Sequence, residues 1–348
     1  MNKKNRYFLF CLILILGLIT LLLYENYSRK KEDINEKSAI LNSVEDLNNL
    51  EYDDKLSAWI VYWDLDVDYN IKELNTHLKE LSYFAADFDS NNNLIVSEDL
   101  LNYYNSTNKQ NYTNYLTIVN DKKNSDTTYS LKDTNLLESL LKDENSRNSH
   151  MEQIINLAKN NYFNGIEIDY ERIKNDIELW NKYLLFINEL YTKCEDNNLK
   201  LRIILEPNTP IEKLNFIGGP TYVMMCYNLH SGKSDPGEKA NPKFIEELIN
   251  RMEKVPGEKS FAIATGGFNW SSNNQVTSIS QTDADELAEK YKVDKKRDEQ
   301  SQCLIFKYTD ENNNEHEVWY ADKITINTWI KVINDRGYHA SIWRLGGN

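Results

Sequence analysis

Three carboxylates alternate with apolar side chains in the segment NGIEIDYE, residues 164–171. Glu167, Asp169 and Glu171 occupy every second position, and because side chains on a strand alternate between its two faces, all three share one face. Crowded carboxylates repel one another and are costly to bury, so we expect at least one of them to have a raised pKa. A carboxyl group of that kind suits general acid catalysis.

Alternation alone leaves two interpretations open. An edge strand with one wet face would turn Ile166, Ile168 and Tyr170 toward the core and the three acids toward solvent. In a closed barrel of parallel strands, the apolar residues would face the outer helices and the acids would point inward. Glu171 would then lie at the carboxyl end of its strand, the end at which such barrels build their active sites. The choice depends on the elements around the segment.

Strand-like and helix-like stretches alternate from residue 56 onward, and a strand, a helix and the next strand recur in that order. Eight strands with helical crossovers predict an α/β fold, a (β/α)8 TIM barrel over residues 54–348. A doubly wound open sheet is the alternative, but no Gly-rich phosphate loop follows the first strand. The strand-like stretches are 56–64, 80–88, 114–121, 163–171, 199–207, 221–230, 259–270 and 339–347. The helix-like stretches, with apolar residues every three or four positions, are 71–81, 150–161, 176–198, 241–255 and 325–338.

Residues 271–322 interrupt this alternation. They contain the helix-like sequence QTDADELAEKYKV and then QCLIFKYTDENNNEHEVWYAD, a pattern that indicates two strands joined by an Asn-rich turn. We therefore expect a small α+β insertion after the seventh strand, on the loop side of the barrel.

Taken in order, these segments resemble glycoside hydrolase family 18, the chitinase-like barrels. NGIEIDYE is similar to the DGxDxDxE signature at the end of strand four, and VMMCYNLH (223–230) to the M-x-Y-D segment of strand six. GGFNW (266–270) resembles the strand-seven segment, and the insertion resembles the family's own. VWYAD (318–322) followed by SIWRLGG (341–347) resembles the ending of the branch of bacterial spore cortex-lytic N-acetylglucosaminidases.

The resemblance implies retaining, substrate-assisted hydrolysis of a polysaccharide with β-linked N-acetyl sugars, peptidoglycan or chitin-like. This mechanism is an exception to the two-carboxylate scheme of most glycosidases. Glu171 would protonate the leaving oxygen while the substrate's acetamido oxygen attacks the anomeric carbon. Asp169 would hold the acetamido N–H and stabilise the oxazolinium-like intermediate, and Tyr227 would hydrogen-bond the acetamido oxygen.

Further residues are substrate-binding candidates by the same resemblance. Trp343 would form the floor of a sugar subsite by stacking, although ordinary core packing is the alternative for it and for Tyr227. Trp270, Glu167 and Asn228 complete the predicted set.

The sequence departs from the family pattern at three positions. Asn164 replaces the first Asp of the signature, Glu167 replaces the second, and Asn228 replaces the Asp after the strand-six Tyr. A catalytically weak carbohydrate-binding barrel at the cell surface is therefore the alternative function, and a structural surface protein is a third.

The amino end, residues 1–28, has a basic start and then an apolar run from residue 7 to residue 24. This run is close to the length of a membrane-spanning helix, and charged clusters flank it on both sides. We expect an uncleaved anchor in the membrane, with a cleavable signal peptide as the alternative. Residues 29–53 are charged and Asn-rich and indicate a tether. The expected location is the cell surface, with the catalytic domain outside the cytoplasm, or secreted if the leader is cleaved.

Composition limits the partners of the chain. A formal net charge of −14 argues against nucleic acid, because phosphate binding needs a basic face. The cysteines (Cys11, Cys194, Cys226 and Cys303) lie far apart, and the histidines are scarce, so neither a disulfide framework nor a zinc site is expected. The sequence predicts no cofactor and no metal.

Overall fold

The computed structural model describes residues 55–74, 77–107, 111–126 and 128–347. The anchor or signal segment predicted at 1–28 and the tether predicted at 29–53 lie outside the described residues. Within the described ranges, no helix combines the length and the apolar character that crossing a bilayer requires.

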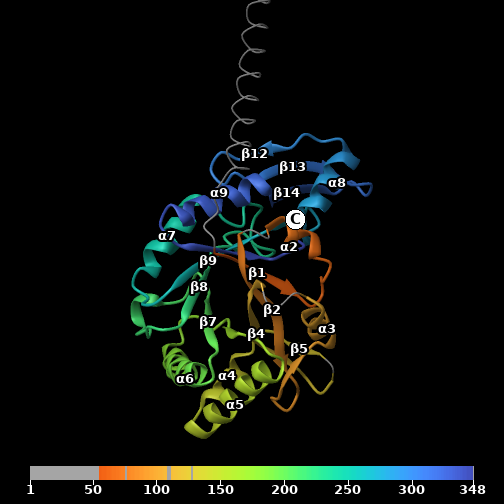
Figure 1. Cartoon of the computed structure of the whole chain (residues 1–348). Helices are drawn as coiled ribbons and strands as arrows, with labels where there is room; N and C mark the ends of the chain where they lie inside the picture. Colours follow the sequence, from red (N-terminus) through yellow and green to blue (C-terminus); the bar gives the residue numbers. More distant parts are fainter. Residues whose placement is uncertain (1–54, 75–76, 108–110, 127, 348) are drawn as a thin grey trace, which may run out of the picture. The chain divides into compact units, whose positions relative to one another are not determined.

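Eight parallel strands close into a barrel, because each pairs with the next and the last pairs with the first, with Ser57 opposite Ser341 (Figure 1). The predicted barrel is therefore confirmed, and the open sheet is excluded. In barrel order the strands are β1 (Leu56–Val61), β2 (Leu78–Phe88), β4 (Thr113–Lys123), β6 (Gly165–Asp169), β7 (Lys200–Leu205), β8 (Thr221–Met225), β9 (Lys259–Ala264) and β15 (His339–Trp343). The short strands β3 (Leu94–Val96) and β5 (Tyr129–Ser130) extend β2 and β4 in antiparallel pairs.

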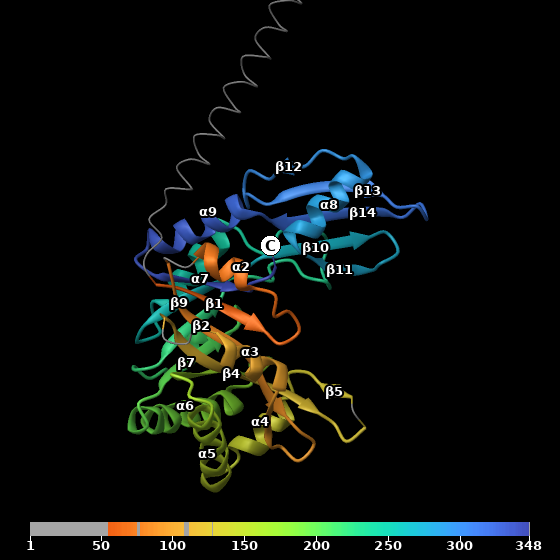
Figure 2. The same cartoon turned by 45° about the vertical axis from the view of Figure 1, so that its right-hand side comes forward.

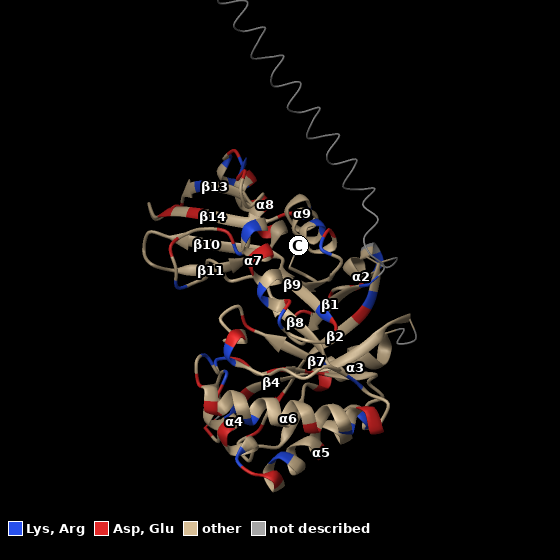
Figure 3. Ribbon diagram, turned by 90° about the vertical axis from the view of Figure 1, so that its left-hand side faces the viewer, with Lys and Arg blue, Asp and Glu red and all other residues tan. Residues whose placement is uncertain are grey.

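Helices cover the outside of the barrel and carry charges of both signs (Figure 3). Side chains at their first turns accept backbone N–H groups, as Asp143, Asp176 and Asn241 do for α5, α6 and α7. The helices are α2 (Asp68–Leu74), α3 (Glu98–Ser106), α4 (Thr134–Leu141), α5 (Glu144–Asn160), α6 (Ile177–Asp196), the 3-10 turn η2 (Ile211–Lys213), α7 (Pro242–Met252) and α9 (Lys323–Asn334). The helix predicted at 71–81 is wrong over residues 78–81, which belong to β2, where Leu78 and Leu81 are buried.

The apolar face of β6 packs outward, as the barrel interpretation predicts. Ile166, Ile168 and Tyr170 belong to the large core between strands and helices. The Tyr170 hydroxyl and His150 Nε2 of α5 lie 2.6 Å apart, and the Tyr170 ring packs on Phe186 of α6. Glu167 and Asp169 on the opposite face therefore point into the barrel, which excludes the edge-strand interpretation.

The insertion is a five-stranded antiparallel sheet with one helix, beside α9 (Figure 2). The stretch 259–270, predicted as one strand, is two strands, β9 and β10, because the chain turns between them. Gly266 has φ +62°, and a Cβ there would lie 2.5 Å from the Ile279 carbonyl oxygen, so a larger residue does not fit. The elements are β10 (Gly266–Ser271), β11 (Val276–Ile279), α8 (Gln281–Tyr291), β12 (Lys296–Arg297), β13 (Leu304–Thr309) and β14 (Glu315–Ala321).

Candidate active site

The three alternating acids run from the barrel interior to its carboxyl rim. Glu167 is fully buried and Asp169, the last residue of β6, is 6% exposed. The side chain of Glu171, two residues beyond the strand, is 17% exposed. A ligand arriving at the rim would therefore meet Glu171 first and Asp169 below it.

Side chains from neighbouring strands fix the backbone around Glu171. The buried amide of Asn120 in β4 accepts a hydrogen bond from the Glu171 N–H (3.0 Å) and donates one to the Glu171 carbonyl oxygen (3.1 Å). Glu206, directly after β7, accepts the N–H of Arg172 at 2.7 Å. The carboxyl end of β6 is therefore held from both sides.

Lys132, in the loop after β5, forms an ion pair with Glu171 through its Nζ and the carboxylate Oε1. Its backbone N–H donates to Asp121 Oδ1 at 2.6 Å, which fixes this residue in a left-handed conformation. A cation thus stands next to the predicted general acid, and it was not predicted from the sequence.

Asp169 has the environment expected of a proton-holding carboxyl group. Its pKa is raised to about 7, chiefly by burial. The charges of Glu167, Glu206 and Asp121 also raise it, and Lys132 lowers it. Its Oδ1 is buried and has no hydrogen-bond partner among the described residues. An unsatisfied buried oxygen is costly unless a ligand or a proton meets it.

Glu167, in contrast, is fully occupied inside the barrel. Its Oε1 accepts from Trp59 Nε1 (2.6 Å) and Thr117 Oγ1 (2.7 Å), and its Oε2 accepts from Ser82 Oγ at 3.0 Å. The guanidinium of Arg202 lies 3.0 Å from Oε2. These partners were not predicted, although an Arg in the middle of the apolar run LKLRIILEP is a signal of an inward-facing charge.

Tyr227 lies two residues beyond β8 and is 7% exposed. Burial raises its pKa well above the usual value, and the negative charges of Asp169 and Glu167 raise it further, so its hydroxyl stays protonated. The structure therefore brings Tyr227 into the field of the acids Asp169 and Glu167.

Trp343, the last residue of β15, lies edge-on to Trp59 and Phe84, with ring centroids 5.7 and 4.9 Å away. Tyr227 belongs to the same apolar cluster inside the barrel. Trp343 keeps an exposed part, so one aromatic surface remains open at the carboxyl rim.

The two other predicted binding residues lie further from these contacts. Asn228 is exposed, with φ +66°. Trp270 lies in β10 of the insertion, where its Nε1 donates to the Ser234 carbonyl oxygen (3.1 Å) and its ring packs edge-on to Phe268.

A cavity of about 470 Å³ lies at the carboxyl end, between the barrel and the insertion. Its wall includes Trp343 and two residues that the sequence did not single out, Trp63, which is 51% exposed, and Arg344, which is ion-paired with Asp64. Lys239 also faces it and donates to the Thr265 carbonyl oxygen at 2.7 Å. Exposed rings next to fixed charges suit a sugar, which needs both stacking and hydrogen bonds.

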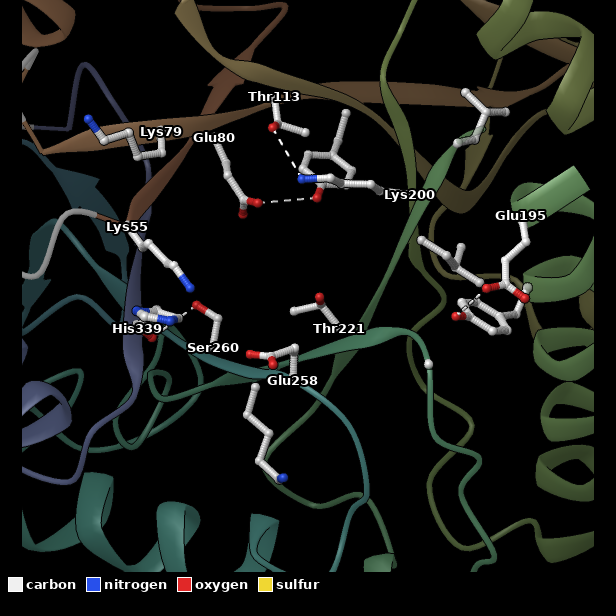
Figure 4. A pocket seen from close by; sticks show the side chains of 16 residues that line it. Lys55, Lys79, Glu80, Thr113, Glu195, Lys200, Thr221, Glu258, Ser260 and His339 are labelled. Atoms are coloured by element: carbon white, nitrogen blue, oxygen red, sulfur yellow. Dashed lines mark hydrogen bonds between the residues drawn. The ribbon is translucent and has the colours of Figure 1, made fainter. Parts of the chain in front are cut away.

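A larger cavity, about 710 Å³, lies at the opposite end of the barrel (Figure 4). The first residues of several strands line it, among them Glu80, Thr113, Lys200, Ser260 and His339. In barrels of this class the amino end serves stability and the carboxyl end serves chemistry, so its size does not make it the candidate site.

The site at the carboxyl end offers a buried acid with a raised pKa, a rim acid beside a lysine, a tyrosine hydroxyl and an aromatic wall. Such a set can donate a proton to a leaving group and hold a polar group beside the reacting atom. Among the described residues, no three His, Cys, Asp or Glu side chains gather as a metal site would require.

No family model matches the sequence. The cortical fragment-lytic enzyme of Bacillus subtilis (strain 168) is 24% identical over 305 residues, which cover 79% of this chain and 66% of that protein. The chain spans between about half and two thirds of the length of these curated relatives.

Solved structures match the fold over most of the chain. The spore cortex-lytic enzyme SleL of Bacillus cereus aligns with a TM-score of 0.72 at 19% identity, covering 84% of this chain and 71% of that one. The fold is that of the chitinase-like barrels. A class V chitinase from Nicotiana tobaccum aligns with a TM-score of 0.65 at 16% identity, over 84% of this chain and 94% of that one. The family resemblance carried by the sequence motifs is thereby confirmed, and the curated relatives named lytic enzyme and glycosylase agree with a glycoside hydrolase.

Proposed function

We propose that the chain is a retaining glycoside hydrolase that cleaves β-linked N-acetylglucosamine-containing glycan with the help of the substrate's own acetamido group. The observation that carries the proposal is the arrangement of Asp169 and Glu171. One is buried with a raised pKa and an unsatisfied oxygen, and the other stands two residues further on at the rim.

Each residue has a role that its position supports. Glu171 protonates the glycosidic oxygen, because it is the acid nearest to solvent. Asp169 receives the acetamido N–H at its unsatisfied oxygen, and the Tyr227 hydroxyl donates to the acetamido oxygen. Trp343 stacks on the sugar ring, and the cavity beside it holds the neighbouring sugar.

Peptidoglycan is the substrate that we favour over chitin, because several relatives carry names of cortex-lytic enzymes. The proposal includes the cell surface as the location, with residues 7–24 as the membrane anchor and residues 29–53 as the tether.

A carbohydrate-binding barrel of low activity is the second candidate, favoured by the departures from the family signature. Asn164 does not support it, since its side chain ties β6 to β4 through the Asn114 N–H (2.9 Å), at the amino end of the strand and away from Glu171. Glu167 and Asn228 are the departures that remain.

Product analysis by mass spectrometry tests the proposal. Purified peptidoglycan and chitin oligomers are digested, together with matched oligomers from which the acetyl groups have been removed. We expect cleavage of the acetylated substrates alone and inhibition by a thiazoline mimic of the cyclised intermediate, which carries the shape of that intermediate. Equal rates on both substrates, or a trapped glycosyl-enzyme, contradict the assisted mechanism. Binding without cleavage supports the second candidate.

A further inference from the structure

A cation is buried in the interior of the barrel, below the acids. Arg202 of β7 is 1% exposed. Its Nη1 donates to Glu80 Oε2 at 3.0 Å and its Nη2 to Ser341 Oγ at 3.4 Å. Its Nε lies 3.0 Å from Glu167 Oε2 but is not aligned for a hydrogen bond, so this contact is an ion pair.

Aromatic rings close the remaining sides of this guanidinium. It lies over the rings of Trp59 and Tyr115, 5.5 and 5.1 Å from their centroids. The Tyr115 hydroxyl also donates to Glu80 at 3.2 Å (Figure 4). A buried charge is retained only where it is paired, and Arg202 is paired on both sides, with Glu80 toward the amino end and Glu167 toward the acids.

The groups around Glu167 match an ionised carboxylate better than a carboxylic acid. Trp59 Nε1, which can only donate, binds Oε1, and the positive guanidinium of Arg202 lies 3.0 Å from Oε2. The hydroxyls of Thr117 and Ser82 donate to the same two oxygens. The coordination therefore fits the ionised carboxylate, with Arg202 as its counterion.

Asp169 is in the opposite situation, since its Oδ1 is buried without a partner among the described residues. The charged groups that act on it are Lys132 from the loop after β5, Glu167 on its own strand, Glu206 after β7 and Asp121 in β4. Three of these four are acids, and burial adds to their effect. We call Glu167, Asp169 and Glu171 the acid column. Within it, the surroundings favour a proton on Asp169 and oppose one on Glu167.

We propose that Arg202 is a positioning residue of the active site, whose buried guanidinium keeps Glu167 permanently ionised so that the proton of the acid column stays on Asp169 alone. Its catalytic consequence rests on the proposed function, because Asp169 then presents a defined protonation state to the acetamido group. Glu167 neither shares nor relays that proton.

Isotope-edited infrared titration tests this without substrate. Protonated carboxyl groups absorb apart from carboxylates, and ¹³C-labelled aspartate separates Asp from Glu. We expect an Asp band near neutral pH that Asp169→Asn removes. In Arg202→Met, Glu167 loses its counterion and should take up a proton, which adds a Glu band that is absent from wild type and from the double variant Glu167→Gln/Arg202→Met. Arg202→Lys keeps the charge and should suppress the added band.

Arg147→Met is the matched control, because Arg147 pairs with Glu189 between α5 and α6 through two contacts of 2.7 and 3.0 Å. It should add no band and leave the Asp169 band unmoved. In hydrolysis assays, the pH profile should shift in Arg202→Met and not in Arg147→Met, which separates positioning from a loss of stability.

Absence of the Glu band in folded Arg202→Met overturns the proposal. Where that variant does not fold, the double variant decides. Its Asp169 band should titrate at lower pH than in wild type, because the Glu167 charge that raises the Asp169 pKa is gone. An unchanged titration overturns the proposal equally. Since these titrations need no glycan, they settle the role of Arg202 even if the chain cleaves none.

Discussion

Carboxylates at the two ends of the barrel interior differ in exposure and in hydrogen-bond partners. At the amino end, the Glu80 side chain is 29% exposed and is paired with both Arg202 and Tyr115. At the carboxyl end, Asp169 is 6% exposed and one of its oxygens has no partner among the described residues. The larger cavity belongs to the amino end and the unsatisfied acid to the carboxyl end. The site that we propose as catalytic thus lies at the unsatisfied acid and not at the larger cavity.

The largest expected effect separates the two ends directly. Glu171→Gln should lower kcat by about 10²–10⁴-fold, as loss of a general acid does, and leave glycan binding intact. The control is Glu195→Gln at the amino-end cavity, where the Glu195 carboxylate accepts from its helix neighbour Tyr191 at 2.9 Å, and kcat should not change. Kinetics on N-acetylated oligomers measure both, and wild-type turnover in Glu171→Gln refutes the assignment.

The second expected effect concerns how the free energy of unfolding depends on pH. Asp169 has a folded-state pKa of about 7 against a usual 3.8, so between these values the folded protein holds a proton that the unfolded chain releases. The free energy of unfolding should therefore fall as pH rises through this window, by about 4 kcal/mol in total. Asp169→Asn should abolish that loss, so its stability relative to wild type should increase from pH 4 to pH 7 (about the two pKa values).

The pKa of Asp322 is shifted in the opposite direction, so its effect on stability has the opposite pH dependence. Burial raises its pKa, but hydrogen bonds from Arg297 and Thr325 together with the Arg297 charge outweigh burial and lower it. Asp322→Asn should therefore be most destabilising at neutral pH, with the difference from wild type narrowing as pH falls. Thermal unfolding across pH measures both variants, and parallel curves for Asp169→Asn and wild type contradict the proton on Asp169.

A third, smaller effect tests whether Glu167, whose oxygens are both hydrogen-bonded, carries a charge. Trp59→Phe removes the N–H that binds the Glu167 carboxylate, and a hydrogen bond to a charged group is worth about 1.5–3 kcal/mol. Trp329→Phe removes an equally buried N–H from the neutral Ser301 carbonyl oxygen (2.9 Å), which is worth about 0.5–1.5 kcal/mol. Denaturant unfolding compares them, and equal losses would show that Glu167 carries no charge.

The smallest effect belongs to the lysines of the amino end. Lys259 lines the larger cavity and donates to the Gly257 carbonyl oxygen at 2.9 Å. Lys259→Ala should change stability by no more than about 0.5 kcal/mol and leave kcat unchanged. A fall in kcat as large as that of Glu171→Gln would move the catalytic site to this end.

The sequence was sufficient wherever the deciding pattern is local. The alternation of Glu167, Asp169 and Glu171 needs only neighbouring residues, and so does the apolar spacing of α6 and α7. Two short helices, α3 and α4, were not predicted. The turn at Gly266 was also missed, because it depends on the Ile279 carbonyl oxygen, which is distant in sequence.

The partners of the acids could not be predicted from one sequence. Trp59 and Glu167 are 108 positions apart, and Arg202 and Ser341 are 139 apart. The alternation of side chains along each strand predicts that these residues point inward. Which of them lie in the same layer depends on the stagger of the strands around the barrel. Lys132 was missed for a related reason, since it reaches Glu171 from a loop with no periodic pattern.

The insertion leaves the barrel and returns to it at one place. Its first residue in the sheet, Gly266, pairs with its last, Ala321. β9 ends at Ala264 and α9 begins at Lys323, so the two junctions lie side by side. A segment with adjoining ends can be lengthened, shortened or exchanged without drawing the flanking elements apart. Evolution can thus replace this module as a unit while the barrel is inherited unchanged, and a protein engineer can graft another one between the same two residues.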